Sequence, residues 1–210
     1  MILFLRRYSF LFFIIFMTLS LYMVFLYAPK EKIMGDVQRI FYFHMGYVLV
    51  FTIAFTVNLI YSIKFLRHNN LADSNIAYIN GEIGTVFTLL TLVSGSIWAK
   101  PVWGTWWTSD PQLTTTLILF ILYFTYLVFH KLALKSGVPR YSSIFAIIAF
   151  IDLPIVYISV RIMRGISPVV FGGEGGGISS EMMDTLLVTF GAFLFLYFYL
   201  LDLRLKLDKI

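Results

Sequence analysis

Six long apolar runs alternate with short polar segments along the chain. The runs cover roughly residues 8–27, 41–65, 81–98, 113–129, 142–160 and 182–201. Each run is long enough to cross about 30 Å of hydrocarbon as a helix that rises about 1.5 Å per residue. The alternating ten-residue segments that are typical of membrane β-barrels are absent from the sequence. The pattern therefore predicts an all-α membrane protein, with residues 1–210 forming a single domain of six transmembrane helices.

The composition agrees with this prediction. Hydrophobic residues make up 60% of the chain, and the mean hydropathy is +0.86, well above the balance of a soluble domain. The first run follows Arg6 and Arg7 and ends at Lys30 without a small-residue cleavage site. We therefore expect an uncleaved first span rather than a signal peptide. The chain has no cysteine, which excludes disulfides and thiolate metal sites.

The lysines and arginines divide unequally between the two sets of loops. Six lie on the side of the first, third and fifth loops: Lys30, Lys32, Arg39, Lys100, Arg161 and Arg164. The other ten lie on the side that holds both termini. Because cytoplasmic loops carry the excess of Lys and Arg, we expect both termini in the cytoplasm and the loop after the third run outside. The same rule accounts for the net charge of +5, so we expect no nucleic-acid partner.

Residues 98–111 contain all four tryptophans of the chain between two apolar runs. So many indole rings are typical of a segment that lies against something flat and apolar, either the lipid interface or a ligand such as a porphyrin. The spacing of Trp103, Trp106 and Trp107 would place them on one face of a short surface helix. Asp110, which a proline follows, is predicted to cap the next transmembrane helix.

His44 is the strongest candidate ligand. It lies three residues into the second run, near the predicted outer surface, among Phe41, Tyr42, Phe43 and Tyr47. Histidine is a common ligand of heme iron, and an aromatic pocket suits a porphyrin face. The alternative is an interfacial histidine bonded to a backbone carbonyl. The other two histidines of the chain lie toward the inner side, where we expect structural roles.

Charged residues in the fifth run admit two interpretations. Asp152 lies inside the run, two residues before Pro154. We expect it to make a helix–helix hydrogen bond that absorbs the proline kink, with proton relay or cofactor contact as the alternative. Arg161 and Arg164 share a helix face at the outer end of the run. They are candidates to bind carboxylates such as heme propionates, or else lipid phosphates.

The segment from Trp98 to Asp110 resembles the tryptophan-rich signature of the cytochrome c assembly family, whose members handle heme in membranes. The stretches Arg39–His44, Gly95–Trp98 and Ile151–Arg161 are similar to that family in the same order, as is Pro168–Gly172. The resemblance therefore covers nearly the whole chain, and the best match is to a six-span type.

The resemblance implies a non-enzymatic role in cytochrome c maturation. Heme b would be held at the outer face of the inner (cytoplasmic) membrane and passed to a periplasmic heme chaperone. An ATP-binding transporter pair, a small single-span membrane protein and membrane lipid would be the other partners. The residues implied in binding are His44 as an axial ligand of the heme iron, with Trp103, Gly104, Trp106, Trp107 and Asp110 as the platform. Arg161, Arg164 and Lys100 are candidates to meet the propionates.

The chain departs from the family at four positions, one of them around Gly46, where a proline is usual shortly after the first histidine. Ser167 precedes Pro168 where a second histidine is usual, Ser109 replaces a further tryptophan, and Gln112 replaces an arginine. With His44 alone, the iron would be five-coordinate or would take water, Met45, Met163 or a partner residue as its other ligand. Two other hypotheses stay open: a structural subunit of an assembly complex that binds no heme, and a small-solute permease.

Overall fold

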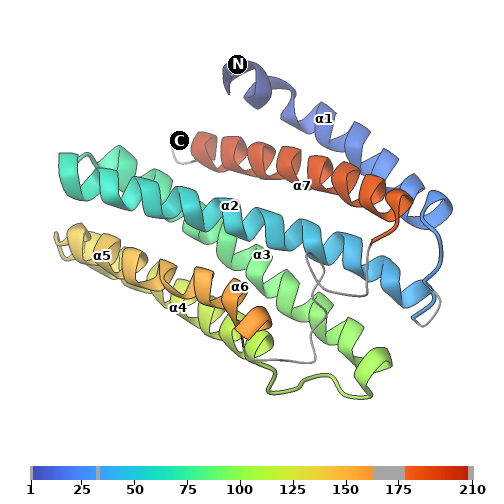
Figure 1. Ribbon diagram of the computed structural model, residues 1–210. Helices are drawn as coiled ribbons and strands as arrows, with labels where there is room; N and C mark the ends of the chain where they lie inside the picture. The colour runs from blue at the N-terminus through green and yellow to red at the C-terminus, as the bar shows by residue number, and fades with distance from the viewer. Residues whose placement is uncertain (1, 32–33, 163–177, 208–210) are drawn as a thin grey trace.

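The computed structural model describes residues 2–31, 34–162 and 178–207. Within these ranges the chain is mainly helical, and six of its helical segments are long and apolar enough to cross a membrane, which confirms the predicted fold class. The helices, shown in Figure 1, are α1 (Ile2–Tyr22), α2 (Arg39–His68), α3 (Leu71–Trp103), α4 (Pro111–Lys135), α5 (Pro139–Phe150), α6 (Asp152–Ile162) and α7 (Ser180–Leu207). A π-helical turn (Met23–Tyr27) extends α1, and a 3₁₀ turn (Asp36–Gln38) leads into α2.

The third span is longer than its apolar run. α3 begins at Leu71, ten residues before the run, and Asn70 caps it by accepting a hydrogen bond of 3.0 Å from the backbone N–H of Ala72. Its 33 residues measure about 50 Å, more than the hydrocarbon thickness of about 30 Å. One polar residue of the added turns is satisfied inside the bundle: Asn80, which is buried, donates to the carbonyl oxygen of Ile76 at 2.8 Å.

α2 and α3 form an antiparallel hairpin at the centre of the bundle. The two residues between them are Asn69, which has a left-handed conformation with φ of 52°, and the cap Asn70. α2 also packs against α5 and α7, while α4 packs against α3, α5 and α6 (Figure 1). α1 lies on the outside of the bundle against α7. The buried hydrophobic residues of α2 to α7 therefore form one continuous interior, and Met17 of α1 packs against it.

The contact of α2 with α7 depends on a glycine. A Cβ atom added at Gly46 would lie 2.1 Å from a ring carbon of Phe193, which is 3% exposed and has no room to move. We expect Gly46→Ala to lower the free energy of unfolding by about 1–3 kcal/mol, the usual cost of overpacking a core. Thermal unfolding in detergent measures the effect. Gly95→Ala, whose Cβ would meet no atom closer than 3.4 Å, is the matched control, and equal stability of the two variants would contradict the prediction.

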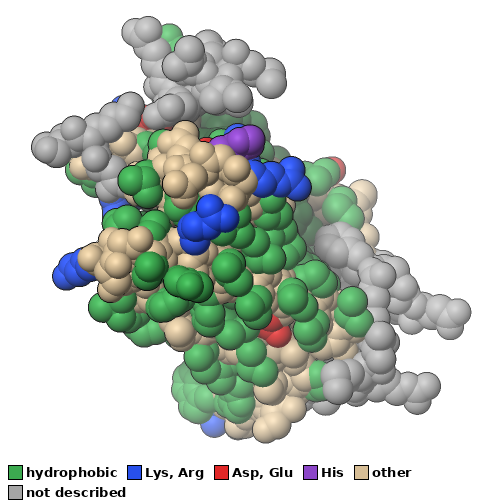
Figure 2. Space-filling model, turned by 90° about the vertical axis from the view of Figure 1, so that its left-hand side faces the viewer, with side chains coloured by type: hydrophobic (Ala, Val, Ile, Leu, Met, Phe, Trp, Pro, Cys, Tyr) green, Lys and Arg blue, Asp and Glu red, His purple; other side chains and the backbone are tan. Residues whose placement is uncertain are grey.

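Both termini lie at one end of the bundle, together with the α2–α3 and α4–α5 connections, and the tryptophan segment lies at the opposite end (Figure 1). Figure 2 views the terminal end and shows Lys and Arg side chains spread over it. At this end Arg204 of α7 pairs with Glu82 of α3 at 2.7 Å, and Arg140 of α5 donates to the carbonyl oxygen of Leu66 at 3.2 Å. The charges that distinguish the two ends therefore also join neighbouring helices.

The fifth span is broken in the middle. α5 ends at Phe150 and α6 begins at Asp152, because Pro154 has no N–H to donate to the carbonyl of Phe150. The expectation that Asp152 absorbs this kink with a helix–helix hydrogen bond is not met at its Oδ2 atom. That oxygen is buried and has no hydrogen-bond partner among the described residues.

Candidate functional site

A pocket lies at the end of the bundle opposite the termini. α2, α3, α4 and α6 form its walls, together with Trp107 from the segment that follows α3, and its cavity volume is about 160 Å³. The lining is mainly apolar and aromatic, with His44 as its one imidazole. Pockets of this kind, apolar with few polar groups, are typical sites for small ligands.

A hydrogen bond between two helices orients His44. Its Nδ1 atom lies 2.9 Å from the hydroxyl oxygen of Ser94 on α3. The Ser94 hydroxyl has a single proton, and where it donates that proton to the carbonyl oxygen of Thr91 at 3.1 Å, Nδ1 is the donor toward Ser94. The Nε2 atom then carries the lone pair, and no hydrogen-bond partner of it lies among the described residues. The ring is thus held in the tautomer that can bind a metal ion through Nε2.

A glycine keeps one edge of this imidazole clear. Gly95 lines the pocket, and a Cβ atom built on it would lie 3.4 Å from Cε1 of His44. No group of three or more His, Asp or Glu side chains that could hold a metal ion occurs in the part of the chain that the structure describes.

The tryptophans separate into two groups. Trp98 and Trp103, on the last turns of α3, line the pocket with Trp107, and their rings meet edge to face with centroids 5.1 Å apart. Trp106 is 58% exposed and lies outside the lining, with the amino group of Lys100 at 5.9 Å from the centre of its ring. The expectation of a surface helix that carries residues 103, 106 and 107 on one face is wrong, because α3 ends at Trp103 and the chain continues without helix to residue 110.

Two of the predicted platform residues shape the backbone beside the pocket. Gly104 ends α3 with φ of 77°, a conformation that favours glycine, and its N–H donates to the carbonyl oxygen of Lys100 at 3.0 Å. Asp110 is 6% exposed and caps α4 as expected, accepting from the N–H of Gln112 at 2.9 Å. Gln112 itself lines the pocket, so the cap of Asp110 fixes the position of a wall residue.

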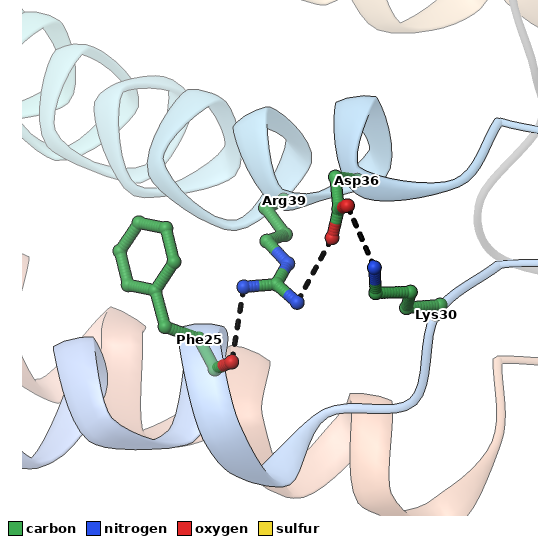
Figure 3. A network of polar contacts seen from close by, with 4 residues as sticks. All are labelled: Phe25, Lys30, Asp36 and Arg39. Carbon is green, nitrogen blue, oxygen red and sulfur yellow. Dashed lines mark hydrogen bonds and ion pairs between the residues drawn. The ribbon is translucent and has the colours of Figure 1, made fainter.

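A polar network holds the start of α2, the helix that carries His44. Figure 3 shows Asp36 between two cations, with Lys30 at 2.8 Å and Arg39 at 2.9 Å. Arg39 also donates to the backbone carbonyl of Phe25 at 3.0 Å. That carbonyl belongs to the π-helical turn after α1. The network therefore links the end of the first span to the helix turn that precedes the candidate ligand.

The chain is similar in sequence to known proteins over nearly its whole length. The family model for heme exporter protein C matches residues 4–209. The chain belongs to the heme exporter protein C family. Heme exporter protein C of Haemophilus influenzae is 32% identical over 87% of this chain and 75% of its own length. A putative cytochrome c biosynthesis protein of Marchantia polymorpha mitochondria is 31% identical over 89% of this chain and 81% of its own length.

Membership in the heme exporter protein C family confirms the resemblance drawn from the tryptophan segment. Of the residues that the resemblance implied, the structure brings His44, Trp103 and Trp107 together around one pocket, with Met45 beside them. Gly104, Trp106 and Asp110 lie next to that pocket and not in its lining.

The two arginines expected near the propionates stay predictions. Arg161 lies in the last turn of α6, and the position of its side chain is not described. Arg164, Ser167 and Met163 lie outside the described residues, so the second axial ligand stays open. Lys100 is engaged with the carbonyl oxygen of Gly104 at 3.0 Å.

His130, at the other end of the bundle, has a structural environment. Its Nδ1 atom lies 3.0 Å from the hydroxyl of Ser142, and its ring stacks on Tyr78 with centroids 4.8 Å apart. Both histidines bond a serine hydroxyl through Nδ1, but the ring of His44 lines the pocket, whereas the ring of His130 stacks on Tyr78.

Proposed function

We propose that this chain holds heme b at the outer face of the cytoplasmic membrane and delivers it to a periplasmic heme chaperone during cytochrome c maturation. The observation that carries the proposal is His44, fixed by Ser94 with its Nε2 atom unbonded, in a pocket lined by three tryptophans. No bond of the cargo is made or broken in this role. The ATP-binding transporter subunits and a small single-span protein are the membrane partners that the proposal includes.

The residues present fit a heme. Nε2 of His44 would supply one axial ligand, and Ser94 acts as the outer hydrogen-bond partner that such a histidine usually has. The indoles of Trp98, Trp103 and Trp107 offer apolar surface for the porphyrin faces. The cavity of about 160 Å³ is small beside the 300–1,000 Å³ usual for ligand pockets. A porphyrin therefore stays partly outside the closed cavity unless the walls move apart, which suits a protein that must give its ligand away.

The test of this function is the visible spectrum of the chain expressed with ample heme and purified in mild detergent. We expect a Soret band in the oxidised protein and a shifted band after reduction. A folded protein that is colourless, even after addition of hemin, would contradict the proposal and favour the structural subunit.

Ser94 gives a test that separates orientation from ligation. We expect Ser94→Ala to weaken heme binding about 10–100-fold, the usual effect of losing the outer partner of a metal-binding histidine. The position of the Soret band should stay close to that of the wild type, because the iron ligand is unchanged. Hemin titration followed by absorbance measures both quantities. Ser94→Thr keeps the hydroxyl and should restore the affinity, and equal binding by all three proteins would exclude the orienting role.

The absence of cysteine makes the orientation directly testable. We expect a single cysteine at Ser109, in the tryptophan segment, to react with a membrane-impermeant maleimide in spheroplasts, in which the outer membrane is opened and the cytoplasmic membrane is intact. A cysteine at Ser136, in the α4–α5 connection, should react only after the cells are permeabilised. The reverse pattern would place the pocket on the cytoplasmic side and overturn the proposed delivery to the periplasm.

A further inference from the structure

The four helices around the pocket do not close it equally. α2 packs closely on α3, α3 on α4, and α4 on α6, whereas α6 and α2 lack comparable backbone contact. In Figure 1, α6 runs alongside α4. The wall between α2 and α6 is therefore a seam, which we define by Val48, Phe51 and Thr52 on α2 and by Val156 and Tyr157 on α6.

A hydrogen bond between side chains crosses this seam. The Tyr157 hydroxyl lies 2.5 Å from Oγ1 of Thr52. Thr52 donates its only hydroxyl proton to the carbonyl oxygen of Val48 at 2.7 Å, so Tyr157 is the donor in the bond across the seam. Tyr157 both lines the pocket and is 47% exposed. It thus stands with one side toward the pocket and the other toward the surroundings of the bundle.

Those surroundings are lipid. Ile155 and Ile158 on α6, and Ile151 directly before it, are 45%, 49% and 60% exposed and offer only apolar surface. Thr52 lies about two helical turns below His44, toward the middle of the second span. The seam therefore faces the hydrocarbon of the membrane and not the aqueous outer surface.

The helix on one side of the seam is free to tilt. The break at Ile151 separates α6 from α5, and Pro154 removes a hydrogen bond that would stiffen the junction. By contrast, α2 continues without interruption from Arg39 to His68. A movement that widens the pocket is therefore expected at α6.

We propose that the pocket is loaded sideways from the bilayer, through the seam between α2 and α6, and that the bond from Tyr157 to Thr52 closes this entrance. The inference rests on the proposed function, since it takes heme as the cargo. Heme is flat and largely apolar and partitions into lipid, so it meets the seam without first crossing the headgroups. The small cavity volume agrees with a pocket that must open to admit it.

The decisive experiment joins the two helices covalently in this cysteine-free chain. Thr52→Cys and Tyr157→Cys are combined and bridged with a short bis-methanethiosulfonate, which a reductant removes. Uptake of hemin from phosphatidylcholine vesicles into the protein in nanodiscs is followed by the Soret band. We expect bridging to slow uptake at least about tenfold and reduction to restore it, while protein loaded before bridging keeps its band.

The matched control cross-links α6 to α4, the helix on which α6 packs closely, and leaves the seam between α2 and α6 free. Thr115 on α4 and Ser159 on α6 have hydroxyl oxygens 3.5 Å apart, and cysteines there receive the same reagent. We expect no slowing in this variant. Three results would each contradict entry through the seam and leave the proposed function standing. They are unchanged uptake in the bridged Thr52–Tyr157 variant, equal slowing in the control, and loss of heme already bound. Absence of a Soret band in the wild type would overturn both.

A second measurement avoids cross-linking. Tyr157→Phe removes the donor and Thr52→Val the acceptor, and each should speed uptake from vesicles roughly two- to tenfold, the factor that corresponds to one net hydrogen bond. The double variant should be no faster than either single variant, because both remove the same bond. Hemin supplied from albumin in the aqueous phase should show no such acceleration. Additive effects, or equal acceleration from both sources, would contradict the proposal.

Discussion

Replacement of His44 by alanine is expected to abolish stable heme binding. The imidazole is the described side chain in the pocket best suited to ligate heme iron, and Ser94 holds it in the competent tautomer. The loss should exceed the roughly 10–100-fold that an outer-shell partner contributes, because the ligand itself is removed. The heme-to-protein ratio of the purified chain, with the pyridine hemochrome spectrum as the assay, measures the effect.

The control for His44→Ala is His68→Ala. His68 ends α2 at the opposite end of the bundle and is exposed, so its removal should leave the heme content unchanged. Imidazole in the buffer should partly restore the Soret band of His44→Ala by entering the space of the lost side chain. Retention of a full band in His44→Ala without imidazole would show that another group, such as Met45 or a residue of the 163–177 segment, carries the iron.

The tryptophans yield the second large effect, and here the structure makes a sharper prediction than the sequence. We expect Trp103→Ala combined with Trp107→Ala to weaken heme binding by roughly a hundredfold or more, since each indole offers a large apolar surface to the pocket. Trp106→Ala should leave the affinity within about twofold of the wild type. Its ring lies outside the lining, near Lys100. Hemin titrations of the purified variants give the affinities.

The Trp106 variant is a control within the same segment. All three tryptophans lie within five residues, so a nonspecific loss of membrane insertion would affect them alike. Membrane content by immunoblot verifies insertion for each variant. If Trp106→Ala loses heme as fully as the double variant, the segment works as one platform, as the sequence resemblance implies, and the division into wall and surface residues is wrong.

The spans could be predicted from the sequence because the bilayer imposes a length and an apolar character on each helix. The helix ends could not be predicted as well. Residues 71–80 look polar, yet they continue α3, since side chains such as Asn80 bond the backbone of their own helix. The break at Ile151 was suggested by Pro154, but the orphaned Oδ2 of Asp152 depends on packing that sequence alone does not reveal.

In the candidate site, too, some features could be predicted from the sequence and others could not. His44 stands out because aromatic residues surround it in sequence, and the cap of Asp110 has a local signature. Ser94 has no such signal, because its bond to His44 joins residues 50 positions apart. The directions of Trp106 and Trp107 depend on where α3 ends, at Gly104, and not on their spacing. Contacts between helices, and the exact end of a helix, are what the sequence pattern leaves undetermined.

The α2–α3 hairpin has a consequence for the order in which the protein is made. One stretch of chain, from Arg39 to Trp103, supplies the proposed ligand His44, its hydrogen-bond partner Ser94 and two of the three wall tryptophans. A ribosome that feeds spans into the membrane in order completes this stretch before α4 and α6 exist. The parts proposed to recognise the iron therefore assemble early, around an open groove, and the helices of that side that are synthesised later, α4 and α6, convert the groove into an enclosure.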